Sequence, residues 1–319
     1  MKKEKENKTG IVRNPSKAPL YIILIVSALA VLTVLGFVTY RIIYRYSHRP
    51  NSIPSLYELW NQKNYEELYA SSAAILSERP FLNTARTFHG YSAFYLAVSQ
   101  TDSTVAQNYL DEAIINLRIA LQSCKEDTRS QIEYMLGKSY FFKDDISSYH
   151  YYADLAVEYL TAAMEHGYRA SDIAERLGLS YASLGRTQES IAAFTEALID
   201  RESDFLLLSI AEQYYANGQP SAAKQYIYRV DVLSNNSDLL ERCHILRGKI
   251  LMDEGDLEGA QMEFESILQN NENSADAHYE LSVIYKKQGN MVKARSEWRE
   301  ALKIQPNHPG VLAEMAESS

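Results

Sequence analysis

One recurring spacing constrains the fold of this chain more than any other feature. Four glycines, Gly185, Gly218, Gly255 and Gly289, follow one another at intervals of 33, 37 and 34 residues. A small residue precedes each glycine, and a second small residue and then a large one follow it. These columns are Gly178, Ala211, Gly248, Ser282; then Ser190, Ala223, Ala260, Ala294; then Phe194, Ile227, Phe264, Trp298. Small residues let two helices approach closely, and glycine ends a helix at low cost, so the pattern predicts four successive helical hairpins.

Earlier parts of the chain show the same order in a less regular form. Leu136, Gly137 and Tyr140 open a third unit, whose halves are separated by seven extra residues around 144–152. Gly90 opens a second unit with eleven extra residues around 97–105, and a short first unit spans about 55–80. The ring-rich insertion 144–152 is interpreted either as a contact site or as an extension of the flanking helices.

This order of residues resembles the tetratricopeptide repeat (TPR) family. The resemblance implies an all-α solenoid of about seven helical hairpins. The predicted segments are 55–128 for degenerate repeats 1 and 2, 129–170 for a stretched repeat 3, 171–308 for repeats 4 to 7, and 309–319 for a short C-terminal cap. So short a cap is expected to leave the side of the last repeat around Trp298 exposed, as a surface for docking or self-association.

The segment Leu20–Tyr40 holds 21 residues without a charge. At 1.5 Å per residue it would span about 30 Å, the thickness of a bilayer core. We therefore predict a basic tail over 1–19, a single transmembrane anchor over 20–46 and a linker over 47–54. The alternative is a cleaved secretory signal, with Ala28-Leu29-Ala30 as the cleavage site. That triplet lies in the middle of the apolar run, which favours the uncleaved anchor.

The distribution of charge gives the orientation of the anchor and the class of partner. Six Lys/Arg residues precede the apolar segment and three follow it, which predicts a cytoplasmic N-terminus and a periplasmic repeat domain in an inner-membrane protein. The reverse topology, with a cytosolic array that docks client proteins or chaperones, is the alternative. Residues 54–319 carry 23 basic and 39 acidic side chains, so nucleic-acid binding is disfavoured and protein partners are favoured.

In this family the first helices of successive units line a concave groove. The resemblance therefore implies a partner-binding set of aromatic residues: Tyr91, Phe94, Tyr95, Tyr134, Phe141, Phe142, Phe205, Tyr215 and Tyr279. Polar and aliphatic residues of the same helices complete it: Thr87, Lys138, Glu175, Leu179, Leu208, Glu212, Ile245, Lys249, Met252, Val283, Lys286 and Lys287. The alternative interpretation is that many of the rings pack between neighbouring first helices.

No sequence motif indicates catalysis, a cofactor or a metal. There is no phosphate-binding loop, GxSxG or HExxH, and Cys124 and Cys243 are expected several repeats apart and unpaired. His244 and His278 occupy the same place in adjacent units without a third ligand. The chain also lacks the Asn that a chaperone-tail clamp uses after the first small residue of each unit. The sequence thus predicts a non-enzymatic, membrane-anchored scaffold in a multiprotein envelope assembly of the secretion, cell-wall, pilus or flagellar type.

Overall fold

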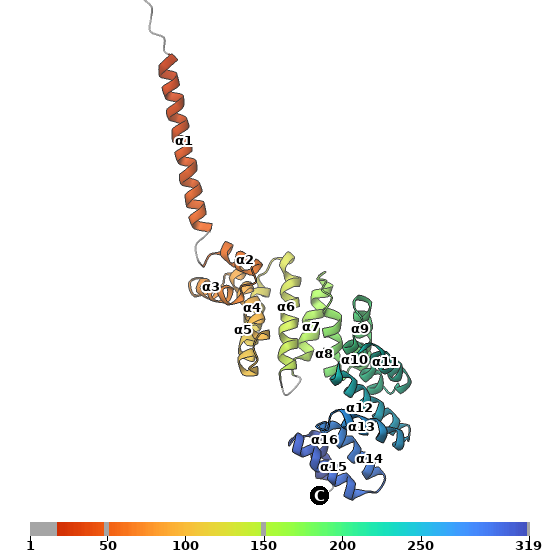
Figure 1. Cartoon of the computed structure of the whole chain (residues 1–319). Coiled ribbons are helices and arrows are strands. Elements are labelled where there is room, and N and C mark those ends of the chain that lie inside the picture. Colours follow the sequence, from red (N-terminus) through yellow and green to blue (C-terminus); the bar gives the residue numbers. More distant parts are fainter. Residues whose placement is uncertain (1–17, 48–50, 148–150, 318–319) are drawn as a thin grey trace, which may run out of the picture. The chain divides into compact units, whose positions relative to one another are not determined.

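The computed structural model describes residues 18–47, 51–147 and 151–317, and these residues form helices and no strand (Figure 1). The helices are α1 (Ala18–Ser47), α2 (Ile53–Asn61), α3 (Tyr65–Glu78), α4 (Asn83–Val98), α5 (Ser103–Gln122), α6 (Glu126–Asp145), α7 (Ala153–Glu165), α8 (Ile173–Ser183), α9 (Thr187–Asp200), α10 (Asp204–Ala216), α11 (Pro220–Leu233), α12 (Ser237–Asp253), α13 (Leu257–Asn270), α14 (Ala275–Lys287), α15 (Met291–Ile304) and α16 (Pro309–Glu317). The all-α prediction is confirmed.

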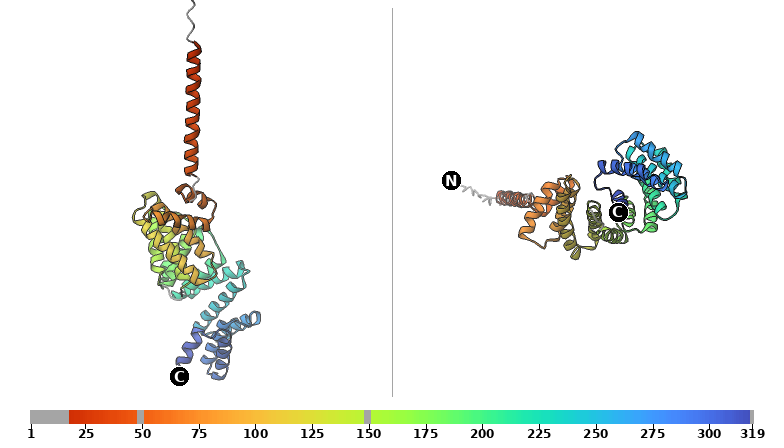
Figure 2. Two further views of the ribbon diagram at one scale, coloured as in Figure 1. Left: turned by 90° about the vertical axis from the view of Figure 1, so that its left-hand side faces the viewer. Right: turned by 90° about the horizontal axis from the view of Figure 1, so that it is seen from below.

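Helices α2 to α15 pair as consecutive hairpins. The closest neighbours within the array are α6 with α7, α8 with α9, α10 with α11, α12 with α13, and α14 with α15. Both views in Figure 2 show these hairpins following one another in chain order. The chain divides into two compact units, and their boundary lies inside α4, between Ser92 and Ala93.

The small and large columns meet inside each hairpin. A Cβ atom built on Gly178 would lie well inside van der Waals contact of the Phe194 ring, and one on Gly248 would meet the Phe264 ring in the same way. Both rings are fully buried. Ser190 adds a hydrogen bond, because its hydroxyl donates to the carbonyl of Gly178 at 2.7 Å. Glycine is thus required here by the closeness of the two helices.

The turn glycines have the backbone conformation that their position predicts. Gly185, Gly218, Gly255 and Gly289 have φ between +68° and +89°, which costs a residue with a Cβ about 1–2 kcal/mol. Each lies between the two helices of one hairpin. The chain can therefore reverse direction there without strain.

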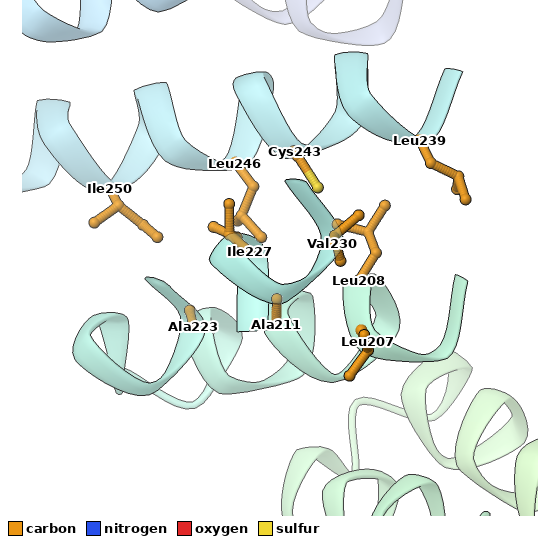
Figure 3. Packing of buried hydrophobic residues seen from close by; sticks show 10 residues of the cluster. All are labelled: Leu207, Leu208, Ala211, Ala223, Ile227, Val230, Leu239, Cys243, Leu246 and Ile250. Carbon is orange, nitrogen blue, oxygen red and sulfur yellow. The ribbon is translucent and has the colours of Figure 1, made fainter. Parts of the chain in front are cut away.

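Neighbouring hairpins share an apolar core. In Figure 3, side chains of α10 and α11 meet those of α12; the buried cluster comprises Leu207, Leu208, Ala211, Ala223, Ile227, Val230, Leu239, Cys243, Leu246 and Ile250. Cys243 is free, as is Cys124, so the prediction that they do not pair is confirmed. Burial raises the pKa of the Cys243 thiol to about 12, which keeps it protonated and unreactive.

The extra residues of the early units mostly lengthen helices. Helices α5 and α6 each have 20 residues, against 11 to 14 for α8 to α11. In the insertion 144–152, α6 runs on to Asp145, and the Asp144 carboxylate accepts a hydrogen bond from the backbone N–H of Tyr152 at 2.9 Å. Residues 148–150 lie outside the described residues, and the side chain of Tyr151 is exposed.

The C-terminal residues correct one expectation. Trp298 is only 6% exposed, because α16 packs on α15 and inserts the buried side chain of Val311 beside it. Lys286 pairs with Glu314 of α16, and His308 pairs with Asp276 at 2.9 Å. The prediction of an exposed Trp298 surface is therefore wrong: nine residues too short to be stable alone are held by tertiary contacts.

At the other end, α1 is a 30-residue helix whose described apolar side chains are exposed. The part of the chain with described side chains holds no helix that is both long and apolar enough to cross a membrane. The predicted anchor includes residues 20–26, whose side chains lie outside the described ones, as do the whole of residues 1–17 and residues 48–50 of the predicted linker.

Candidate functional site

The predicted binding residues of the early repeats are largely inside the protein. Tyr91, Phe94 and Tyr134 are 4%, 2% and 8% exposed. Tyr91 lies 5.3 Å from the Trp60 ring, measured between ring centroids, and Phe94 lies 5.5 Å from Phe142. These three rings contribute to packing and offer little surface to a partner, as the alternative interpretation proposes. Tyr95, Phe141 and Phe142 are half-buried.

Two cations cover the half-buried rings of α6. The Arg176 guanidinium of α8 lies 5.0 Å from the ring centroid of Phe141 and 4.9 Å from that of Phe142. The Lys138 ammonium lies 5.4 Å from the ring centroid of Phe94. Contacts of this kind stabilise by about 0.5–2 kcal/mol each, more where water is excluded. The aromatic face of α6 is thus already occupied by side chains of this chain.

Asp172 holds these cations in place. Its carboxylate accepts hydrogen bonds from the Tyr134 hydroxyl at 2.8 Å and from Arg176 Nε at 3.0 Å, and it pairs with Lys138 at 3.3 Å. Burial alone would raise the pKa of Asp172, but these three partners outweigh it and lower that pKa below its usual value. Burial lowers the pKa of Lys138 and raises that of Tyr134. Asp172 therefore joins α6 to α8.

The later repeats leave a groove along their first helices. A cavity of about 250 Å³ is lined by Glu212, Tyr215, Arg242, Ile245, Leu246, Lys249 and Asp276, which come from α10, α12 and α14. Four of these residues, Glu212, Tyr215, Ile245 and Lys249, belong to the set that the sequence predicts for the binding groove. We call this cavity the first-helix groove.

Ion pairs between consecutive first helices form the walls of the first-helix groove. Arg242 of α12 pairs with Glu212 of α10 at 2.6 Å, and the Tyr215 hydroxyl donates to Asp253 at 2.7 Å. Lys249 of α12 pairs at 3.0 Å with Glu280 of α14, a buried carboxylate. Burial raises the pKa of Glu280, although Lys249 opposes that shift. The groove combines both signs of charge with the apolar side chains of Ile245 and Leu246.

Other members of the predicted set lie away from the first-helix groove. Phe205 packs against the core shown in Figure 3, and Leu208 belongs to that core. Tyr279 is covered by α16: a Cβ atom on Gly310 would lie 2.5 Å from its ring, and His308 lies 5.0 Å from it between centroids. Packing of neighbouring helices therefore removes these rings from solvent.

The histidines pair with carboxylates and do not stack on each other. His244 Nδ1 lies 2.6 Å from Glu263 Oε2, and His278 Nδ1 lies 2.7 Å from Glu297 Oε2. Each pair joins the two helices of one hairpin and spans 19 residues. Among the described residues, no three His, Cys, Asp or Glu side chains are arranged to hold a metal.

Two segments of the chain match family models described as tetratricopeptide repeat, residues 153–205 and residues 251–317. These segments are tetratricopeptide repeats. The first segment begins at α7 and the second covers α13 to α16, so the repeats reach both sides of the first-helix groove. No curated protein matches the chain in sequence.

Solved structures share the fold of the tetratricopeptide repeats. The C-terminal part of a TPR repeat-containing protein from Cytophaga hutchinsonii is 14% identical, with a TM-score of 0.54, and the match covers 82% of this chain and 98% of that one. The apo form of the quorum sensor NprR from B. thuringiensis is 15% identical, with a TM-score of 0.56, over 81% of this chain and 76% of that one. At such identities the likeness concerns the fold alone.

Proposed function

We propose that this protein is a non-enzymatic scaffold whose first-helix groove binds a segment of another protein. Arrays of helical-hairpin repeats use extended surfaces of this kind to bind partners. The observation that supports the proposal is the cavity of about 250 Å³ whose lining comes only from α10, α12 and α14. Its mixed charges suit an extended or helical peptide better than a small apolar ligand.

Site-specific photocrosslinking of the full chain in its native cells tests this proposal. A photoreactive amino acid at Ile245, inside the groove, is expected to crosslink a defined partner. The same amino acid at Tyr228, exposed on the second helix α11, serves as the control and is expected not to capture that partner. The further changes Tyr215→Ser and Arg242→Ala are expected to reduce the Ile245 crosslink at least about tenfold while helicity is unchanged. Equal crosslinking from both positions would contradict the proposal.

We further propose that residues 20–40 anchor the scaffold in the inner membrane, with a cytoplasmic N-terminus and the repeats in the periplasm. The uncharged 21-residue segment, its basic N-terminal flank and the long helix α1 support this proposal. The partner would then belong to a multiprotein envelope assembly of the secretion, cell-wall, pilus or flagellar type.

Reporter fusions after Ser319 test the anchor and its orientation in a bacterial host. Alkaline phosphatase, which is active only outside the cytosol, is expected to be active on the full chain and inactive on a chain without residues 1–46. Green fluorescent protein at the same position is expected to be dark. Fluorescence from a membrane-bound fusion would support the reversed topology, and a fully water-soluble full chain would refute the anchor.

A further inference from the structure

The junction between the third and fourth hairpins differs from its successors. Seven residues, 166–172, connect α7 to α8, whereas three connect α9 to α10 and three connect α11 to α12. On the side of the first helices this long connection is closed, because Tyr168 stacks on Tyr134 at 4.5 Å between centroids and Asp172 binds Tyr134 and Lys138. The opposite side of the same junction is open.

A second groove runs between α7 and α9 on the open side. Its cavity measures about 510 Å³ and is lined by Thr161, Met164, Glu165, Arg169, Leu177, Tyr181, Glu189, Ala192, Ala193 and Glu196. The floor is apolar, because Met164, Leu177 and Ala193 lie there, and the carboxylates lie among the lining residues. We call this cavity the α7–α9 groove. It shares no residue with the first-helix groove.

The two helices beside the α7–α9 groove are acidic and carry no basic residue. Helix α7 contributes Asp154, Glu158 and Glu165, and helix α9 contributes Glu189, Glu196 and Asp200. The nearest arginines already have acceptors. Arg169 donates to the carbonyls of Met164 and Tyr168, and Arg186 pairs with Glu189 at 2.8 Å. An apolar floor with an acidic rim therefore selects for a ligand with an apolar face and basic flanks.

We propose that the α7–α9 groove binds an amphipathic helix with Lys/Arg flanks from another protein. The 14 residues of α9 give the groove a length of about 21 Å, which is four turns of helix. A second copy of this chain is a poorer occupant. Its basic helix α15 buries its apolar residues Ala294, Trp298 and Ala301 within its own repeat, so no apolar stripe is left to enter a groove.

Binding of a defined peptide to the full chain tests the proposal. The probe is a fluorescent peptide of about 14 Leu and Lys residues, patterned as an amphipathic helix, and fluorescence anisotropy measures its affinity in a neutral detergent. A matched peptide with Glu in place of Lys is expected not to bind. Ala192→Trp, which fills the groove from an exposed position, is expected to weaken binding at least about tenfold. The paired change Glu165→Lys and Glu196→Lys is expected to do the same.

Matched controls separate this site from general attraction to an acidic protein. Gln225→Trp places the same ring at the corresponding exposed position of α11, and Glu258→Lys with Glu272→Lys changes the net charge equally elsewhere. Both are expected to retain wild-type affinity. Equal weakening by test and control variants, or equal binding of the Glu peptide, would overturn the proposal. So would a dimer in sedimentation that Ala192→Trp dissolves, because it would make a second copy the occupant. Loss of the Ile245 crosslink would leave this result unaffected.

Discussion

The ring of Phe194 occupies the space that a Cβ atom on Gly178 would need. The contact joins α8 to α9 and recurs between Gly248 and Phe264 in α12 and α13. The closeness of the two helices in a repeat thus depends on a missing side chain in one of them. This relationship leads to the first of four predictions.

Gly178→Ala is expected to destabilise the protein by about 1–3 kcal/mol, because the added methyl group must displace a fully buried ring. The loss should exceed the gain of up to about 1 kcal/mol that alanine brings to a helix interior. Urea denaturation followed by circular dichroism measures the change. Ser183→Ala, at an exposed position of α8, is the control and should be neutral or slightly stabilising. A more stable Gly178→Ala variant would show that the helices can separate without cost.

Asp172→Asn is expected to lower stability at pH 7 by about 1–3 kcal/mol, because Tyr134, Lys138 and Arg176 lose a charged acceptor. The pKa of Asp172 is lower in the folded protein, so its contribution is present above the pKa of the unfolded chain. That contribution disappears as the pH falls through the folded pKa. The difference between variant and wild type should therefore shrink below about pH 3. Urea unfolding at pH 7 and pH 3 checks this, with Asp200→Asn on the exposed face of α9 as the control.

Lys249→Met is expected to destabilise the protein more at pH 7 than at pH 5. Burial raises the pKa of Glu280 in the folded state, so its effect on stability is most favourable below the unfolded pKa and is lost as the pH rises through the folded pKa. Removing Lys249 removes the opposing influence and deepens that loss, by about 1–3 kcal/mol for an unsatisfied buried carboxylate. Urea unfolding at both pH values measures it.

The double variant Lys249→Met with Glu280→Gln provides the control for this pair. Glutamine has no charge to desolvate, so the double variant should recover stability at pH 7 and lose the pH dependence. The same destabilisation at pH 5 and pH 7 in the single variant would show that Glu280 is not responsible.

Val311→Asp is expected to open the contact between α16 and Trp298. The chain has two tryptophans, so Trp60→Phe leaves Trp298 as the sole indole reporter. Its fluorescence maximum should move to longer wavelength as water reaches the ring. Leu312→Asp changes the neighbouring exposed residue of the same helix and should leave the spectrum unchanged. An unshifted spectrum in Val311→Asp would mean that α16 does not shield the indole.

The hairpins could be predicted from sequence because their cause is local. The Gly178 and Phe194 columns report how close two helices lie, and Gly185 reports a turn. Burial between hairpins is different, since it depends on how far one hairpin lies from the next. Phe94 and Tyr134 were predicted for a binding surface because they lie on first helices, but the same face also packs against the neighbouring repeat. The sequence gives no measure of which use prevails.

Two further features show the same limit. Helix α16 is too short to be expected on propensity alone, and Val311 and His308 stabilise it only through contacts with α14 and α15. The α7–α9 groove depends on the seven residues between α7 and α8, whose effect on helix spacing has no signature in periodicity. The histidine pairs did leave a signal, because His244 and Glu263 recur 34 residues later as His278 and Glu297.

That recurrence bears on how such an array can change its length. His244–Glu263 lies within one repeat, and Lys249–Glu280 joins one repeat to the next. Because every pair is internal to a unit or links adjacent units, copying one unit in the gene would reproduce a full set of partners for the new segment. Arrays of this chemistry can therefore gain or lose whole hairpins without orphaning a charge.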